Sequence, residues 1–225
     1  MVILALETAV DPGSIALWRD GTVIARMCPG DRPNSETLLP LAEATLHEIG
    51  FGFADVDAIA LGMGPGSFTG LRVACGVAQG LAVARDLPLL GVSTLEAMAL
   101  SSQARKVVVA LDARMGEVYH GVFVDGVLLG EISVCPPEDV PMPDETGFVA
   151  CGNGLAAYPS LAERFMPLAD ALLPEIVPTA ESIVRLAAPR LLRGERIDPA
   201  DAVPLYVRDK VAKTVAERLA EGGRA

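Results

Sequence analysis

An internal repeat constrains the fold of this chain more than any other feature. When the 225-residue sequence is shifted along itself by about 105 positions, the segment VILALET that begins at Val2 falls on VVVALDA, which begins at Val107. Glu7 then matches Asp112. Both segments are typical of a buried β-strand that ends in an acidic residue. The repeat predicts two related lobes rather than one continuous domain.

The same shift also aligns two Asp-Gly pairs. Asp20-Gly21 matches Asp125-Gly126, and each pair lies between two apolar runs. Asp-Gly in this setting predicts a two-residue type I′ hairpin turn, because that turn requires positive φ. Each half is therefore expected to open with a strand, an acidic residue, a loop, a second strand, a tight turn and a third strand.

The later parts of the two halves correspond less closely. DAIALGMGPG, residues 57–66, and GFVACGNG, residues 147–154, both predict a strand that runs into a Gly-x-Gly turn. The first half has a helix pattern at residues 35–50 where the second has only PPEDVPMPDE, residues 136–145. The second lobe is thus predicted to be a reduced copy. Such a duplication resembles the two-lobed actin-like (ASKHA, ribonuclease H-like) α/β fold, with lobes at residues 1–103 and 104–225 and the last helix packing back on the first lobe.

Composition and charge narrow the function. Half of the residues are apolar and the formal net charge is -11, which repels phosphate backbones. Any RNA involved is expected to be held mainly by another chain. The most apolar stretch, residues 73–90, is interrupted by glycines and charges and is too polar to span a bilayer. The first residues have no cationic lead of the kind an export signal carries, so we expect a cytoplasmic protein without membrane contact.

The four cysteines are too far apart in sequence for a zinc knuckle or a thioredoxin-type pair. They are Cys28, Cys75, Cys135 and Cys151. Buried, reduced thiols are the simpler interpretation.

The segment GMGPGSFTGLRVACGVAQGLAVAR, residues 62–85, has two interpretations. A glycine loop between a strand and a helix has the general shape of a phosphate cradle. However, Gly70 is followed by Leu71 and Arg72 instead of the Lys-Ser/Thr of a P-loop, and the glycine spacing does not fit a dinucleotide fingerprint. The loop is a weak candidate for a nucleotide site.

The second interpretation concerns the helix itself, which has two rows of small residues. One row contains Gly66, Gly70, Ala74, Ala78 and Ala82, and the other contains Gly76, Gly80 and Ala84. Each interior glycine costs a helix about 1 kcal/mol relative to alanine. Such a helix needs a packing reason, either against its own sheet or against a helix from outside. Helix propensity does not decide between them.

Several motifs together resemble the TsaB (YeaZ) family. They are LALETAV, NSETLLP, GMGPGSFTGLRVACGVAQGLA, LLGVSTLEAMA, VVVALDARMGEVYHGVF and PLYVRDKVA, of which GPGSFTGLR at residues 64–72 is the most specific. The likeness runs to about Ala212 and is weakest between Val134 and Pro204. The chain departs from the family pattern at Glu7, where many members have aspartate, and at Asn34, where histidine is frequent.

The resemblance implies a scaffold without catalytic residues of its own. Its task would be the installation of threonylcarbamoyl on adenosine 37 of tRNAs that read codons starting with A. The implied partners are the catalytic relative TsaD and the ATPase TsaE, with tRNA bound indirectly and a homodimer when the chain is alone. The implied partner surface is built from the first two helices of the first lobe: Ser35, Glu36, Leu39, Ala42, Glu43, Leu46, Ser67, Gly70, Leu71, Ala74, Val77, Ala78 and Leu81.

Two enzymatic alternatives remain. An actin-fold kinase or ATPase would use the cleft between the lobes, for which the candidate residues are Glu7, Thr8, Asp112 and Arg114. Because the phosphate loops are poor, this cleft is predicted to be vestigial. At most weak nucleotide or Mg²⁺ binding is expected there or at the interface of the complex. The simpler alternative, which the poor phosphate loops favour, is that Glu7 and Asp112 only cap strand ends that face water. A glycoprotease-like metallopeptidase would need several metal ligands, and the only histidines are His47 and His120, in different lobes. No metal and no resident cofactor are expected.

Overall fold

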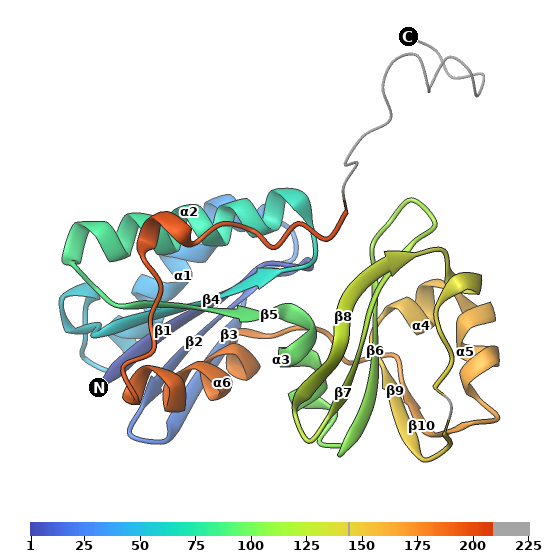
Figure 1. Cartoon of the computed structure of the whole chain (residues 1–225). Coiled ribbons are helices and arrows are strands. Elements are labelled where there is room, and N and C mark those ends of the chain that lie inside the picture. The colour runs from blue at the N-terminus through green and yellow to red at the C-terminus, as the bar shows by residue number, and fades with distance from the viewer. Residues whose placement is uncertain (144, 209–225) are drawn as a thin grey trace, which may run out of the picture.

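The computed structural model describes residues 1–143 and 145–208 and contains two five-stranded mixed sheets side by side (Figure 1). The strand order is β3-β2-β1-β4-β5 in the first sheet and β10-β9-β6-β7-β8 in the second. In each sheet three antiparallel strands are extended by two parallel ones. The predicted α/β duplication is therefore confirmed.

The first sheet contains β1 (Val2–Glu7), β2 (Ser14–Arg19), β3 (Thr22–Met27), β4 (Ala58–Gly64) and β5 (Leu89–Ser93). The turn between β2 and β3 has φ of 50° at Asp20 and 89° at Gly21, as a type I′ turn requires. In the second sheet the matching turn has φ of 49° at Asp125 and 77° at Gly126. Both predicted hairpins are thus confirmed.

Helices cover both faces of the first sheet. On one face lie α1 (Asn34–Glu48) and α2 (Phe68–Arg85), which bury Leu38, Leu46 and a row of small residues of α2 against the strands. The short 3₁₀ helix η1 (Phe53–Asp55) leads into β4. The opposite face is covered by α6 (Ala180–Leu192), which packs on β1, β2 and β4 although it follows the second sheet in sequence.

The second sheet contains β6 (Lys106–Asp112), β7 (Val118–Val124), β8 (Val127–Cys135), β9 (Phe148–Cys151) and β10 (Ala169–Leu173). The connecting helix α3 (Thr94–Ser101) packs on one face, where Leu95 and Met98 are fully buried. On the other face α4 (Gly154–Ala157) and α5 (Pro159–Phe165) cover a core that includes Phe148 and Phe165.

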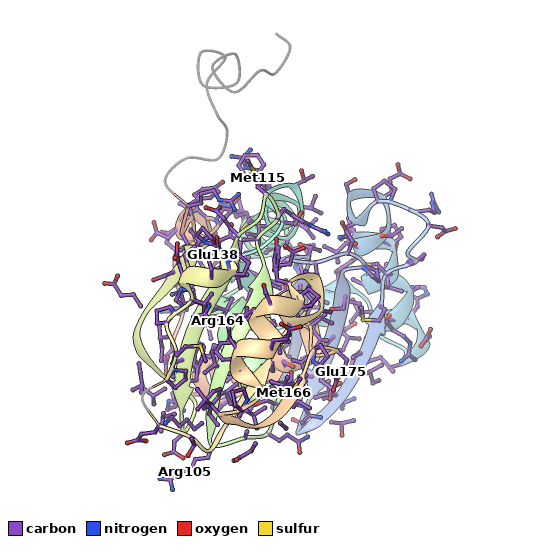
Figure 2. All side chains as sticks on the ribbon, turned by 90° about the vertical axis from the view of Figure 1, so that its right-hand side faces the viewer. Arg105, Met115, Glu138, Arg164, Met166 and Glu175 are labelled. Carbon is purple, nitrogen blue, oxygen red and sulfur yellow. The ribbon has the colours of Figure 1, made fainter. Side chains whose placement is uncertain are left out.

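The second lobe is reduced in the place the repeat predicts. Between β8 and β9 the described residues contain only the 3₁₀ helix η2 (Pro137–Asp139), where the first lobe has α1. Arg164 of α5 holds this segment by donating hydrogen bonds to the carbonyl oxygens of Pro137 (2.5 Å) and Val140 (2.9 Å), on the side of the lobe seen in Figure 2.

After α6 the chain crosses back over the first lobe as an extended segment, residues 197–208, which we call the strap. Ile197 donates to the Leu89 carbonyl oxygen (2.8 Å) at the edge of β5. The strap then forms the 3₁₀ helix η3 (Pro199–Asp201), passes beside α2 and ends near the second lobe (Figure 1). The predicted last helix, within residues 210–223, lies outside the described residues. No helix among the described residues is both long enough and apolar enough to cross a bilayer.

Candidate docking surface and interlobe pocket

The glycines at the start of α2 are required by the packing of the first lobe itself. Ser67 donates its main-chain N–H to the Ala9 carbonyl oxygen (2.8 Å), and the Thr8 hydroxyl donates to the Gly70 carbonyl oxygen (2.6 Å). A Cβ at Gly70 would overlap the main-chain oxygen of Thr8, and one at Gly66 would overlap Ala9. The contact with residues 8 and 9 is therefore enough to require glycine at both positions of the loop.

This contact turns the first row of small residues inward. Six residues predicted for the partner surface are buried and point into the first lobe instead of outward: Ala42, Leu46, Gly70, Leu71, Ala74 and Ala78. Successive members of the row on α2 are four residues apart and share one face of the helix. Since Gly70 lies against Thr8, the rest of the row must lie on the sheet.

The other predicted surface residues remain accessible. Ser35, Glu36, Leu39 and Glu43 are exposed along α1, and Ser67, Val77 and Leu81 are half-buried on or beside α2. The second row of small residues, Gly76, Gly80 and Ala84, is exposed on α2. We define the docking face as the exposed side chains on the outer sides of α1 and α2: Ser35, Glu36, Leu39, Glu43, Gly76, Gly80, Val83 and Ala84.

The docking face is apolar where α2 contributes to it. Val83 is 72% exposed and Leu39 on α1 is 41% exposed. A Cβ added to Gly76 or Gly80 would meet no atom of the described residues within 4 Å. Within residues 1–143 and 145–208 these two glycines therefore have no packing role, although each weakens the helix.

A pocket of about 440 Å³ lies between the two lobes. The first lobe contributes residues 9–11 and the first turn of α2, the second contributes the loop after β6 with Asp112 and Arg114, and the strap contributes residues 205–208. Figure 2 shows Met115, which also lines the pocket, at the end of the second lobe opposite Arg105. The pocket is thus built from three separate parts of the chain.

Asp112 is already occupied by neighbours in its own lobe. Its carboxylate accepts hydrogen bonds from the Arg114 main-chain N–H (2.8 Å) and the Tyr158 hydroxyl (3.0 Å), and forms an ion pair with the Arg114 guanidinium (3.2 Å). Desolvation and this contact with Asp112 raise the pKa of Tyr158. The Asp112 side chain therefore fixes the turn after β6 in addition to facing the pocket.

Comparison with known proteins identifies the family. A family model described as TsaD, tRNA N6-adenosine threonylcarbamoyltransferase, matches residues 30–215. The chain is 39% identical over 227 aligned positions to the tRNA threonylcarbamoyladenosine biosynthesis protein TsaB of Escherichia coli (strain K12), covering 94% of this chain and 96% of that protein. The TsaB protein of Haemophilus influenzae is 34% identical, with 94% and 95% covered. The chain belongs to the TsaB family.

Solved structures support the same family assignment. A crystal structure from Pseudomonas aeruginosa, described as an uncharacterized protein with similarity to peptidase YEAZ, superposes with a TM-score of 0.83 at 37% identity, covering 92% of this chain and 99% of that one. YeaZ from the same organism gives 0.80 at 35% identity, with 91% and 99% covered. The two-lobed actin-like fold expected for a TsaB family member is therefore present over almost the full length.

In this TsaB family member the two acidic strand ends differ. Asp112 lines the interlobe pocket, whereas Glu7 is 1% exposed and Thr8 is buried, and neither lines it. The Ala9 main-chain N–H donates to the Glu7 carboxylate (2.6 Å), and a Cβ at Gly62 would overlap that carboxylate. The strand end at Glu7 therefore does not face water, and the Glu7 carboxylate does not line the pocket. Desolvation raises its pKa to about 7.

Asn34 departs from the family pattern at a buried position. Its side-chain oxygen accepts a hydrogen bond from the Gly13 main-chain N–H (2.9 Å), and its side-chain nitrogen donates to the Asp11 carboxylate (2.7 Å). The residue therefore ties the start of α1 to the loop between β1 and β2.

The histidines do not meet. His47 is exposed on α1 in the first lobe, and His120 is buried on β7 in the second, where desolvation lowers its pKa. Among the described residues no three His, Cys, Asp or Glu side chains are arranged to hold a metal ion. All four cysteines are unpaired, and Cys28, Cys75 and Cys151 are buried. Burial raises the pKa of Cys75 to about 11 and that of Cys151 to about 12.

One group beside the docking face was not found from the sequence. The Arg72 guanidinium lies 3.6 Å from the centre of the Phe68 ring and donates a hydrogen bond to the Tyr206 hydroxyl of the strap (3.2 Å). Phe68 and Tyr206 are 41% and 50% exposed. The sequence carries a signal for one half of this group, since Phe68 and Arg72 are four residues apart on one helix. Tyr206 is 134 positions from Arg72, and nothing in the sequence pairs those two segments.

Proposed function

We propose that this chain is the non-catalytic scaffold subunit of the assembly that installs threonylcarbamoyl on adenosine 37 of tRNAs reading codons that start with A. It acts by docking the α1–α2 face on the catalytic relative TsaD, and the ATPase TsaE joins them. In the absence of that partner the same face pairs two copies of the chain. The protein works in the cytoplasm and holds tRNA only indirectly.

The proposal draws its pathway from the family. The relatives from Escherichia coli and Haemophilus influenzae are both named tRNA threonylcarbamoyladenosine biosynthesis protein TsaB, and they align with this chain nearly end to end. Because the alignment includes both lobes and not a single motif, the task of the family is the simplest function for the whole chain.

The observation that carries the docking mechanism is the position of two glycines. Gly66 and Gly70 have an intramolecular reason, since a side chain there would overlap residues 8 and 9. For Gly76 and Gly80 the described part of the chain offers no such reason, yet each costs α2 about 1 kcal/mol of helix stability. A second protein whose backbone approaches α2 closely supplies the missing reason. Exposed Val83 and Leu39 give such a contact the apolar centre that stable interfaces share.

The arrangement of polar groups supports a role without catalysis. The acidic residue that the first lobe contributes in the repeat, Glu7, is buried away from the pocket, and Asp112 is held by Arg114 and Tyr158. A kinase or ATPase of this fold would need carboxylates from both lobes free to hold Mg²⁺ and phosphates. A metallopeptidase would need three or four ligands around one point, while His47 and His120 lie in different lobes.

The test is omission from a reconstituted reaction. Threonylcarbamoylation of tRNA by TsaD, TsaE and the enzyme that makes threonylcarbamoyl-AMP should stop without this chain and resume when it is added. A full rate in its absence would refute the scaffold role. Micromolar binding of Mg-ATP to the isolated chain that is lost in Asp112→Ala would favour the kinase alternative, and a stoichiometric transition metal in elemental analysis would favour the metallopeptidase.

A further inference from the structure

The strap makes its last contacts in both lobes. In the first lobe Leu205 donates its main-chain N–H to the Met63 carbonyl oxygen at the end of β4 (2.7 Å), and the Tyr206 hydroxyl accepts the hydrogen bond from Arg72 of α2. Two residues later Arg208 donates to the Ala113 carbonyl oxygen of the second lobe (3.1 Å) and forms an ion pair with Glu117. Four residues thus bridge the lobes.

This bridge is separate from the covalent connections between the lobes. In the view of Figure 1 the chain passes between the lobes through α3 and through residues 174–179, both near mid-height, while the end of the strap crosses above them. Residues 205–208 also form one wall of the pocket between the lobes. Opening the pocket around the lower connections would separate Arg208 from the second lobe or pull Leu205 and Tyr206 from the first.

We propose that residues 205–208 are a latch that holds the two lobes closed, and that docking of a partner on α2 and closure of the pocket favour each other through this latch. The second half of the proposal rests on the proposed function; the first does not. A partner bound to the docking face would therefore stabilise the closed arrangement of the two lobes.

Arg72 is the link between the two events. It lies one turn before Gly76 on the exposed side of α2, so a partner that covers the docking face also covers or borders Arg72. Its guanidinium is fixed between the Phe68 ring and the Tyr206 hydroxyl. A partner that holds Arg72 in place stabilises Tyr206 on α2 and, through it, the closed pocket. Because such coupling is reciprocal, opening the latch must weaken docking.

The latch is tested on the full chain by residual dipolar couplings of backbone amides, fitted separately for residues 1–93 and 106–173. One alignment tensor should fit both lobes in the wild type and in Arg105→Ala, which removes an exposed ion pair with Asp125 far from the strap. In Arg208→Ala the tensors of the two lobes should diverge. A single tensor that still fits both lobes in Arg208→Ala would overturn the latch.

Two further measurements complete the test. Circular dichroism checks that Arg208→Ala is folded. Tyr206→Ala removes the contact of the latch with Arg72 of the first lobe and should give the same divergence. TsaD should bind Arg208→Ala about tenfold more weakly than wild type if the closed state falls to roughly a tenth of the molecules, and Arg105→Ala should bind normally. Equal affinity of Arg208→Ala and wild type overturns the coupling. If the wild type does not bind TsaD, the proposed function is refuted instead. The residual dipolar couplings then still test the latch by themselves.

Discussion

The Thr8 hydroxyl donates a 2.6 Å hydrogen bond to the carbonyl oxygen of Gly70, and the main-chain oxygen of Thr8 occupies the space where a side chain on Gly70 would begin. The two atoms closest to such a side chain are the main-chain oxygen and carbon of Thr8, which cannot move without shifting the backbone. We therefore expect Gly70→Ala to lower the free energy of unfolding by about 3 kcal/mol, at the upper end of overpacking effects. Urea unfolding followed by circular dichroism measures the change.

Gly76→Ala is the matched control for that experiment. It makes the same substitution six residues later in the same helix, at a site with open space. Here the gain in helix propensity should stabilise the chain by about 1 kcal/mol or less. Equal effects at the two positions would contradict the assignment of an inner and an outer row on α2.

The outer row predicts a variant that loses its partner and keeps its fold. Gly80→Trp places a large ring on the exposed side of α2, where a Cβ meets nothing within 4 Å. The unfolding midpoint should stay close to wild type, while affinity for TsaD should fall about a hundredfold, roughly 2.7 kcal/mol, because close packing is lost. Calorimetric titration gives both affinity and stoichiometry.

Ala156→Trp provides the comparison, since it adds the same ring at an exposed position of α4 in the second lobe. It should bind TsaD like wild type. If both tryptophan variants bind normally, the docking face lies elsewhere.

The sequence predicted those features of the fold that depend on neighbouring residues in the chain. Positive φ at Asp-Gly predicted both hairpins, and the repeat placed Glu7 and Asp112 at matching strand ends. The sequence did not predict features that depend on contacts between residues far apart in the chain. The helix periodicity revealed two rows on α2, but the row that faces the sheet is selected by residues 8 and 9, about sixty positions earlier in the chain.

The start of α3 shows the same limit. Ser93 and Glu96 have the spacing of a capping box, which predicts that each side chain accepts a hydrogen bond from a main-chain N–H at the start of the helix. Instead the Glu96 carboxylate forms an ion pair with Arg190 of α6, and the Ser93 hydroxyl is buried without a hydrogen-bond partner among the described residues. The competing cation is 94 positions away, so the local pattern carried no sign of it.

Asp112 is expected to stabilise the second lobe even without a ligand. Asp112→Ala removes the acceptor for Arg114 and Tyr158 and should cost about 2 kcal/mol of unfolding free energy, as for charged hydrogen bonds that are largely buried. Glu145→Ala, which removes an ion pair whose carboxylate is 82% exposed, should change stability by less than about 0.5 kcal/mol. Thermal unfolding of the wild type, Asp112→Ala and Glu145→Ala measures both changes in stability. An Asp112→Ala variant as stable as the wild type would mean that the hydrogen bonds of Asp112 do not stabilise the lobe.

Glu7 predicts how stability depends on pH. Burial raises its pKa from 4.5 to about 7 in the folded chain, so between these values the unfolded state releases a proton that the folded state keeps. Stability attributable to this group is complete below about pH 4.5, falls as the pH rises, and is lost above about pH 7. The total is on the order of 3 kcal/mol for a shift of this size in a fully buried group. Glu7→Gln retains an acceptor for the Ala9 N–H but does not titrate, so its free energy of unfolding should exceed that of wild type increasingly from pH 5 to pH 8. Parallel curves for the two proteins over that range would show that Glu7 ionises as readily in the folded chain as in water, and that it is not buried as described.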